Sequence, residues 1–274
     1  MARLIVFTDI DGTLLDSNRL RWRPAEPAVR GLRARGIPVV LCTSRTRAEV
    51  LPLRKELGLR DPFVMENGGA ICIPRNYFPF ALPTARVEAG FQVLELGQRY
   101  QNLVQALDEA AKTSGIEARG FSRMSEKEVA ACLGTNRAGA RLARLREYDE
   151  PFLLQKGTTK QRERFFRWLQ QRGLRWQEDG CFHHLMGDND KGAAVSRLIE
   201  LYRQQYGIIH TLGLGDAASD LDFLSIVDSA VVVAAADGSH DPELRRRLPQ
   251  ARLEPAPGPA GWNRAILDVL EAAD

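Results

Sequence analysis

Near its start the chain reads Leu4-Ile5-Val6-Phe7-Thr8-Asp9-Ile10-Asp11-Gly12-Thr13, an apolar run that ends in two closely spaced carboxylates. A short continuous apolar run is typical of a strand buried on both faces, as in a parallel sheet. Residues i and i+2 of an extended chain face the same side, so Asp9 and Asp11 can reach one site. Like charges resist that arrangement unless a cation lies between them, and Mg²⁺ prefers oxygen ligands. The stretch therefore predicts a magnesium site where the first strand ends.

The segments that follow alternate between helix and strand. Apolar residues recur at helical spacing over 24–35 and 47–57, and each helix is followed by a glycine, a common stop signal. Buried strands are predicted over 37–42, 63–65 and 70–73. This order predicts right-handed crossovers and a parallel sheet. The pattern later resumes with a helix over 192–206, a strand over 210–214, a short helix over 220–226, a strand over 230–234, a proline-rich loop over 255–259 and a helix over 262–272.

A different pattern separates these two parts. Pro74, Pro79 and Pro83 mark a linker. The residues after it mix both kinds of element, with helices predicted over 98–114, 125–133 and 160–172 and strands over 152–155 and 176–186. We therefore predict an α/β protein with a Rossmann-like parallel-sheet core and an inserted α+β domain. The predicted bounds are 1–82 and 188–274 for the core and 83–187 for the insert.

Polar side chains follow three of the predicted core strands: Asp9 and Asp11 after the first, Thr43 and Ser44 after the second, and Asp216 and Asp220 after the strand over 210–214. In open α/β sheets ligands bind at the carboxyl ends of the strands, so these residues should meet at one edge. Lys191 opens the helix after the insert and is one of only six lysines among 38 basic residues, which indicates a specific role. A compact ammonium is a suitable partner for a phosphate or a carboxylate.

Four motifs in this order resemble those of the haloacid dehalogenase-like hydrolase superfamily: Asp9-Ile10-Asp11-Gly12-Thr13, Thr43, Lys191, and Gly215-Asp216-Ala217-Ala218-Ser219-Asp220. The resemblance implies a phosphatase in which Asp9 attacks phosphorus and Asp11 acts as general acid and then general base. It implies that Thr43 and Lys191 neutralise phosphoryl oxygens. It also implies Mg²⁺ bound by Asp9, Asp216 and the backbone carbonyl of Asp11, with Asp220 holding a metal-bound water. The insert resembles a C2-type cap domain, which covers the site and selects the substrate.

Finer strings are similar to those of one subgroup, the mannosyl-3-phosphoglycerate phosphatases of mannosylglycerate (compatible-solute) biosynthesis, and their glucosyl-specific relatives. The strings are Thr43-Ser44-Arg45-Thr46, Glu66-Asn67-Gly68-Gly69, Arg146-Glu147-Tyr148-Asp149-Glu150-Pro151-Phe152, and His184 shortly before Asp190-Lys191-Gly192. The likeness implies that the substrate is bound by Ser44, Arg45, Glu66, Asn67, Gly68 and His184. The likeness does not indicate whether the sugar is mannose or glucose.

Other functions share the four motifs. A different sugar-phosphate phosphatase, sucrose-phosphate-like or broad, and a phosphomannomutase-like phosphotransferase are the alternatives from the same superfamily. A binding protein on this fold is disfavoured, because it would be expected to lack one of Asp9, Asp11, Lys191 or Asp216, and all four are present.

Composition limits the partners. A formal charge of +3 with scattered basic residues does not indicate nucleic-acid binding. No apolar run reaches the length of about 18 residues that a membrane helix needs. The four cysteines have no CxxC spacing, and Cys42 and Cys72 lie in apolar stretches that predict burial. We expect a cytoplasmic monomer or homodimer that uses Mg²⁺ and acts on a small phosphorylated molecule.

Overall fold

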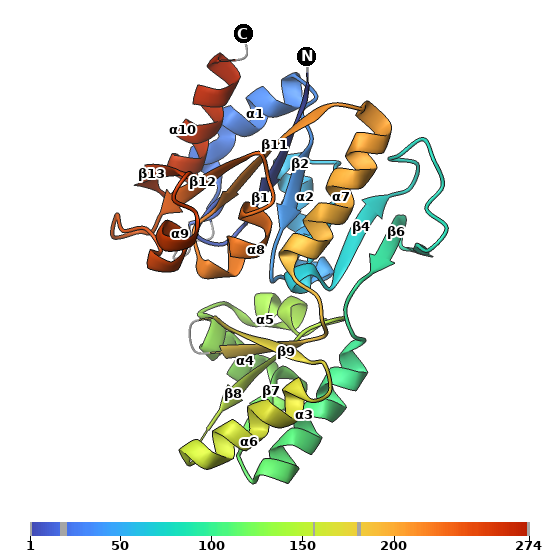
Figure 1. Cartoon of the computed structure of the whole chain (residues 1–274), viewed down its shortest axis with the longest axis vertical. Coiled ribbons are helices and arrows are strands. Elements are labelled where there is room, and N and C mark those ends of the chain that lie inside the picture. The colour runs from blue at the N-terminus through green and yellow to red at the C-terminus, as the bar shows by residue number, and fades with distance from the viewer. Residues whose placement is uncertain (1, 17–20, 156, 180–181, 273–274) are drawn as a thin grey trace.

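The computed structural model describes residues 2–16, 21–155, 157–179 and 182–272. They form a larger part, the core, and a smaller part, the cap, which lie end to end along the long axis (Figure 1). The chain enters the cap between β6 (Phe91–Glu95) and α3 (Tyr100–Ser114). It returns to the core between β10 (Phe182–Met186) and α7 (Lys191–Tyr206). The cap is therefore an insertion in the core.

The core is built on one large sheet. Among the described residues nine strands form it, in the order β13-β12-β11-β1-β2-β3-β4-β6-β5. Pairing is parallel from β13 to β3 and antiparallel from β3 to β5, which confirms the predicted parallel centre. The remaining strands are β1 (Arg3–Thr8), β2 (Val39–Cys42), β3 (Phe63–Met65), β4 (Ala70–Pro74), β5 (Arg86–Glu88), β11 (Ile209–Gly215), β12 (Ser229–Ala234) and β13 (Arg252–Pro257).

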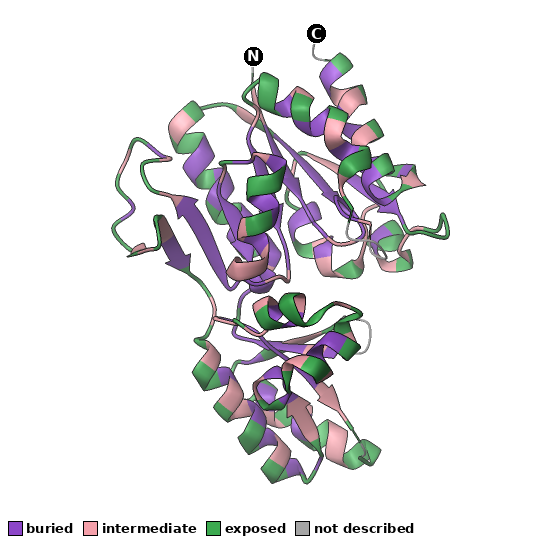
Figure 2. Ribbon diagram, turned by 180° about the vertical axis from the view of Figure 1, so that it is seen from behind, coloured by how far each residue is buried: buried purple, intermediate pink, exposed green. Residues whose placement is uncertain are grey.

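Helices cover both faces of this sheet. Val6 of β1 lies in one buried cluster with residues of α1 (Glu26–Ala34), α2 (Arg47–Leu57) and α10 (Gly258–Glu271). Its neighbours Ile5 and Phe7 lie in the other cluster, with residues of α7 and α8 (Leu221–Leu224). Figure 2 shows the central strands buried along their length. This two-sided burial explains why the first strand is an unbroken apolar run with no polar alternation.

The cap pairs a small antiparallel sheet with helices. Among the described residues four strands form it, in the order β7-β8-β10-β9. Leu107 of α3 and Phe165 of α6 pack in one buried cluster with Phe152 of β8. The other elements are β7 (Ala118–Gly120), β8 (Glu150–Leu154), β9 (Arg175–Asp179), α4 (Glu126–Leu133), α5 (Arg137–Ala143), α6 (Thr159–Gln170) and, back in the core, α9 (Pro242–Arg247). Short 3-10 turns span Arg23–Ala25 (η1), Glu66–Gly68 (η2), Phe121–Arg123 (η3) and Ala218–Asp220 (η4).

Two expectations from the sequence are corrected. The cap does not begin at residue 83, because β5 and β6 pair antiparallel with each other and β6 with β4 of the core sheet. Residues 255–259 are not a loop: β13 runs to Pro257 and α10 begins at Gly258. Prolines are tolerated in β13 because it is an edge strand, where one row of N–H groups has no strand partner.

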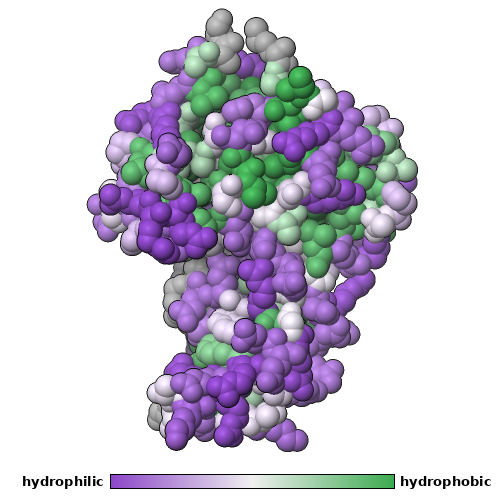
Figure 3. Space-filling model, in the orientation of Figure 1, coloured by the Kyte–Doolittle hydropathy of each residue, from purple (hydrophilic) through white to green (hydrophobic). Residues whose placement is uncertain are grey.

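Other local predictions are confirmed. The helix over 47–57 and the strand over 63–65 have the predicted bounds. The helix predicted over 125–133 is α4, which begins with a capping box of Ser125 and Glu128. Cys42 and Cys72 are fully buried. None of the described helices combines the length and apolar character needed to cross a membrane. The face of the cap seen in Figure 3 is mostly hydrophilic.

Candidate active site

Asp9 lies just past the end of β1, in a nearly closed environment. The residue is 6% exposed, and its Oδ1 accepts a hydrogen bond from Lys191 Nζ at 2.7 Å. Gly12 makes the turn behind it with φ of +87°, and a Cβ at Gly12 would lie 2.2 Å from Asp216 Oδ2. The turn requires glycine, because another side chain would displace Asp216.

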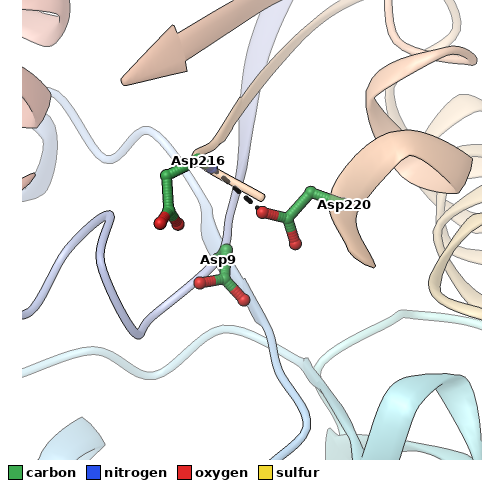
Figure 4. Close-up of side chains that lie close together, drawn as sticks. All are labelled: Asp9, Asp216 and Asp220. Carbon is green, nitrogen blue, oxygen red and sulfur yellow. Dashed lines mark hydrogen bonds between the residues drawn. The ribbon is translucent and has the colours of Figure 1, made fainter. Parts of the chain in front are cut away.

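A second pair of carboxylates follows β11. Asp216 Oδ1 accepts a hydrogen bond from Thr13 Oγ1 at 2.7 Å, and Asp220 Oδ2 accepts one from the backbone N–H of Asp216 at 3.0 Å. Each of Asp9, Asp216 and Asp220 offers a carboxylate oxygen within 4.8 Å of the other two. Figure 4 shows these three side chains gathered from the chain segments that follow β1 and β11. Residues about 200 positions apart along the chain thus meet at the sheet edge predicted from the strand ends.

Lys191 joins these carboxylates. It is the first residue of α7, behind the N-cap residue Asp190, and it is 3% exposed. Its Nζ donates to Asp9 Oδ1 and to Asp220 Oδ1, both at 2.7 Å. Burial disfavours the ammonium, but Asp220 and Asp9 outweigh burial and raise the pKa of Lys191 above its ordinary value. Lys191 is therefore a fixed cation beside Asp9.

The cluster is short of positive charge. Burial, and after it the charge of Asp220, raises the pKa of Asp9 well above its ordinary value although Lys191 lowers it. Burial and Asp220 also raise the pKa of Asp216 to about 7. The carboxylates of Asp9, Asp216 and Asp220 face one ammonium group, that of Lys191. The ligand atoms that these three side chains offer to a metal ion are all oxygens. This donor set fits a hard divalent cation such as Mg²⁺, which favours carboxylate ligands.

Asp11 is held by Arg45. Arg45 Nε donates to Asp11 Oδ2 at 2.7 Å, and Arg45 Nη2 donates to Asp11 Oδ1. A two-point pair of this kind fixes the plane of the carboxylate as well as its position. Arg45 was expected to bind the substrate, and this stays a prediction; in the structure its guanidinium binds Asp11. The structure therefore favours a positioning role for Arg45.

A cavity of about 290 Å³ opens beside Asp9. Its described lining residues are Asp9, Asp11, Ser44, Asn67, Lys191, Asp216, Ala217 and Ser219 from the core, and Gln177 and His184 from the cap. Thr43, which is 1% exposed, lies behind this lining, where its Oγ1 accepts from the backbone N–H of Arg45 at 3.1 Å. The cap therefore closes one side of the cavity that contains the acidic cluster.

The segment Glu66-Asn67-Gly68-Gly69 joins the core to the cap. Glu66 is fully buried, and its carboxylate accepts from the backbone N–H of Glu147 at 3.0 Å and of Tyr148 at 2.7 Å. Burial raises the pKa of Glu66 to about 8. Gly68 has φ of +84°, and a Cβ there would lie 2.0 Å from the carbonyl oxygen of Asp190. These contacts give Glu66 and Gly68 a structural role between core and cap, and the expectation that they contact the substrate stays a prediction. Asn67 does reach the cavity.

His184 reaches the cavity from β10. The residue is 7% exposed, and its Nδ1 lies 2.8 Å from Oδ2 of the fully buried Asp149. The preceding His183 points to the other face of the cap sheet, where its ring stacks on Phe152 at 5.2 Å between centroids. Successive side chains thus alternate between the two faces, as in any strand.

Some residues at the site were not predicted. Thr13 binds Asp216, Gln177 lines the cavity, and Asp149 supports His184. Buried Arg146 donates to the carbonyl oxygen of Ser44 at 2.7 Å, which connects the cap to the loop after β2. Arg146 and Asp149 lie in a string that indicated a subgroup, but no spacing in the sequence shows that they meet core residues.

Comparison with known proteins agrees with this geometry. The family described as haloacid dehalogenase-like hydrolase matches residues 6–128. The chain is 38% identical over 266 residues to a glucosyl-3-phosphoglycerate/mannosyl-3-phosphoglycerate phosphatase of Methanococcoides burtonii. The matched region covers 97% of each chain. The chain belongs to the haloacid dehalogenase-like hydrolase family. A phosphatase of the same name from Persephonella marina is 30% identical to this family member, with 97% of each chain covered. A mannosyl-3-phosphoglycerate phosphatase of Pyrococcus furiosus is 32% identical over 84% of this chain and 90% of its own length.

Solved structures of distant relatives share the fold of this family member. A phosphatase of the haloalkanoate superfamily from Bacteroides thetaiotaomicron has a TM-score of 0.68 at 14% identity, and covers 98% of this chain and 96% of its own. A Thermoplasma acidophilum protein has a TM-score of 0.66 at 19% identity, with 99% of each chain covered. The sucrose-phosphatase of Synechocystis has a TM-score of 0.60 at 16% identity and covers 98% of each chain.

Proposed function

We propose that this protein is a Mg²⁺-dependent phosphatase that converts mannosyl-3-phosphoglycerate or glucosyl-3-phosphoglycerate to the glycosylglycerate and phosphate. The observation that carries the reaction type is the buried Asp9, which binds Lys191 at 2.7 Å and shares a cavity with Asp11 and Asp216. The substrate is proposed from the names of the relatives that match nearly the whole chain.

Asp9 is the nucleophile in this proposal. A carboxylate oxygen of Asp9 attacks phosphorus, the bond from phosphorus to the glycerate oxygen breaks, and Asp9 carries the phosphoryl group. Asp11 donates a proton to the leaving alkoxide and later takes one from the water that hydrolyses the aspartyl phosphate. Arg45 holds both oxygens of Asp11, so the carboxyl keeps one orientation for both proton transfers.

Asp9, Asp216 and the backbone carbonyl of Asp11 would hold Mg²⁺. When bound, the ion supplies positive charge for the phosphoryl oxygens. Asp220 has a different place, because Lys191 binds its Oδ1 and the backbone N–H of Asp216 binds its Oδ2. We therefore assign Asp220 to positioning Lys191 and the loop after β11.

Two further residues stabilise the transferring phosphoryl group. Lys191 brings a fixed positive charge to within 2.7 Å of the Asp9 carboxylate. Thr43 Oγ1 accepts from the backbone N–H of Arg45, which leaves the hydroxyl hydrogen to donate to a phosphoryl oxygen. Pre-aligned donors of this kind stabilise charge that spreads over the phosphoryl oxygens in the transition state.

The enclosure favours a small substrate. The cavity of about 290 Å³ lies at the lower end of the range of roughly 300–1,000 Å³ that small-molecule sites occupy. Its cap wall, formed by Gln177 and His184, would exclude a macromolecule from Asp9. A cytoplasmic location and a monomeric or homodimeric state stay predictions.

The test is phosphate release with Mg²⁺ from mannosyl- and glucosyl-3-phosphoglycerate, measured beside a panel of hexose phosphates. We expect fast, metal-dependent release from at least one of the two phosphoglycerates. Equal and very low rates on both, with fast turnover of a hexose phosphate, would refute the substrate and leave the phosphatase standing. Loss of substrate without phosphate release would point to a phosphotransferase.

A further inference from the structure

A buried hydrogen-bond relay connects α10 to Asp9, the proposed nucleophile. The indole Nε1 of Trp262 in α10 donates to Thr8 Oγ1 at 2.9 Å, and Thr8 Oγ1 donates to the carbonyl oxygen of Asp9 at 2.8 Å. Thr8 and Trp262 are both fully buried. Neither is among the described residues that line the cavity, and the proposed chemistry uses neither side chain.

The direction of this relay follows from the groups that form it. An indole N–H can only donate a hydrogen bond, and a backbone carbonyl can only accept one. A hydroxyl has one hydrogen, so the Thr8 oxygen accepts from Trp262 while its hydrogen points to the carbonyl oxygen of Asp9. The indole therefore leaves the hydroxyl with one arrangement that satisfies both neighbours.

Packing alone gives no reason for a hydroxyl at this position. Val6, two residues earlier on the same face of β1, lies in an apolar cluster that also contains Trp262. Valine and threonine are both branched at Cβ and have nearly the same shape. A hydroxyl taken out of water is costly unless it forms hydrogen bonds. The two hydrogen bonds of Thr8 meet that condition, so its polar group is explained by what it binds.

The residues before Trp262 place the indole at the end of β1. A Cβ at Gly261 would lie 1.9 Å from the carbonyl oxygen of Ala256, so the first turn of α10 packs closely on the end of β13. A Cβ at Gly258 would lie 3.6 Å from the carbonyl oxygen of Gly12. The start of α10 is therefore in contact distance of the turn that follows the two carboxylates of β1.

Asp9 is held at three points when the relay is counted. Its backbone N–H donates to the carbonyl oxygen of Leu214 at 2.9 Å, its Oδ1 accepts from Lys191, and its carbonyl oxygen accepts from Thr8. The first contact fixes the peptide before Asp9, and the last fixes the peptide after it. A carboxylate that attacks phosphorus needs the right direction as well as the right position, because the reacting atoms must be aligned.

We propose that the Thr8 hydroxyl, oriented by Trp262, fixes the peptide after Asp9 and so aims the Asp9 carboxylate at phosphorus. Both are positioning residues, because they act through Asp9. The inference rests on the proposed function, in which Asp9 is the nucleophile. Without the hydroxyl, the Asp9 carbonyl and the indole N–H each lose this partner inside the core, which is costly, and the peptide can turn toward another donor. Such a turn would carry the carboxylate away from its line of attack.

The test separates the hydroxyl from the shape of its side chain. Thr8→Val removes the hydroxyl and keeps the branched shape, whereas Thr8→Ser keeps the hydroxyl. We expect Thr8→Val to lower kcat by about 10- to 100-fold with KM nearly unchanged, because a small misplacement of a reacting group has an effect of that size. Thr8→Ser should keep most of the wild-type kcat. Trp262→Phe should lower kcat by about three- to tenfold, as for one lost neutral hydrogen bond.

The matched control is Thr211→Val in the neighbouring strand β11. Thr211 is 1% exposed and lies near the start of β11, whereas the site follows the end of that strand. Its hydroxyl donates to Asp228 Oδ2 at 2.7 Å. Both valine variants remove a buried hydroxyl and should be less stable in urea, but Thr211→Val should keep the wild-type kcat. The value of kcat is referred to the folded fraction, measured by circular dichroism.

Three results would overturn the inference: wild-type kcat in Thr8→Val, equal losses of kcat in Thr8→Ser and Thr8→Val, or an equal loss in Thr211→Val. If Thr8→Val does not fold, Trp262→Phe decides. A lowered kcat at constant KM in that variant supports the relay, and a wild-type kcat overturns it.

The choice of substrate keeps the relay separate from the proposed function. The assays use Mg²⁺ and the glycosyl-3-phosphoglycerate that the wild type hydrolyses faster. A wild type that cleaves p-nitrophenyl phosphate but neither phosphoglycerate would refute the proposed substrate, and the relay is then tested by the same comparison of kcat on that ester. A wild type that releases phosphate from none of these esters would refute the proposed function and the inference with it.

Discussion

The two walls of the cavity are built from different structures. The core wall consists of short segments after buried parallel strands, and its charged groups bind one another: Lys191 binds Asp9 and Asp220. The cap wall comes from β9 and β10, where Gln177 and His184 are cross-strand partners. His184 Nδ1 lies 2.8 Å from Oδ2 of Asp149, which also belongs to the cap. In the proposed function, the core wall carries out the chemistry and the cap wall determines which molecule reaches it.

The two walls are nevertheless tied together. Thr46 Oγ1 donates to the carbonyl oxygen of Leu142, Arg146 donates to that of Ser44, and Glu66 accepts from the cap backbone. These contacts connect the cap segment over 142–148 to the core loops that carry Ser44 and Asn67. Changes in the core wall should alter turnover of every substrate, and changes at the junction should alter stability.

The largest effect is expected at the core wall. Asp9→Asn keeps the shape of the side chain but removes the nucleophile, so phosphate release should fall by about 10⁴-fold or more for every substrate. A sensitive phosphate assay on purified variant and wild type checks this. The exposed Asp188→Asn is the control and should retain wild-type activity. Near-normal rates in Asp9→Asn would rule out covalent catalysis by Asp9.

Two glycines give a matched test of the junction. Gly68 and Gly90 have nearly the same φ, +84° and +85°, but a Cβ at Gly68 would lie 2.0 Å from Asp190 O, whereas Gly90 has open space. Gly90→Ala should lower the free energy of unfolding by about 1–2 kcal/mol, the cost of holding alanine in the left-handed conformation. Gly68→Ala should cost at least about 4 kcal/mol in the free energy of unfolding, because backbone atoms must move. Urea unfolding measures both, and equal costs would contradict the close junction.

The acidity of the core wall predicts a pH dependence in metal-free protein. The folded-state pKa of Asp216 is raised from 3.8 to about 7, so its protonated form is favoured in the fold. The stability that this group contributes is fully present below about pH 4 and is lost as pH rises through 7. We therefore expect the free energy of unfolding in EDTA to fall less in Asp216→Asn than in the wild type as pH rises from 5 to 8. The two decreases should differ by at most about 2–3 kcal/mol.

Thermal or urea unfolding at the two pH values measures the difference, and Mg²⁺ should restore stability to wild type at pH 8 more than to Asp216→Asn. Identical pH slopes in the two proteins would refute the crowding of carboxylates around Asp216.

The smallest effect is expected at Arg45. Arg45→Lys keeps the charge but loses the two-point contact with Asp11, so Asp11 should lose its fixed orientation. We expect kcat to fall about tenfold, or about 1.4 kcal/mol in activation free energy, with KM nearly unchanged. Steady-state kinetics on one phosphoglycerate measures both. A rise in KM with unchanged kcat would instead place Arg45 on the substrate.

The core was predictable because its pattern is local. Burial on both faces makes β1 and β2 continuous apolar runs, and glycines end the helices between them. Parallel strands bring their carboxyl ends to one edge, so the sequence predicts that Asp9 and Asp216 lie together. Lys191 opens a helix, and the family resemblance placed it at the same site. The carboxylates of Asp9 and Asp11, two residues apart, also indicated a bound cation, because like charges resist such closeness.

The cap and the junction were not predictable in the same way. β5 is short and half-buried, so its residues carry little alternation, and the edge strand β13 contains prolines that indicate a loop. The partners of Arg45 and Glu66 are set by tertiary contacts: Arg45 meets Asp11, and Glu66 meets the backbone of Tyr148. No sequence period reports such contacts between distant segments, so the sequence predicted substrate contacts for Arg45 and Glu66 and did not predict their protein partners.

The most direct test of the central claim is to trap the phosphoryl group on the core wall. Asp11→Asn enzyme is mixed with Mg²⁺ and p-nitrophenyl phosphate that carries radioactive phosphorus, and the mixture is quenched in acid. The p-nitrophenolate leaving group needs no general acid, so this variant should form the aspartyl phosphate faster than it hydrolyses it. We predict label on the peptide that contains Asp9, released by hydroxylamine as expected for an acyl phosphate, and no label in Asp9→Asn. Label on any other residue, or equal label in Asp9→Asn, would contradict the account.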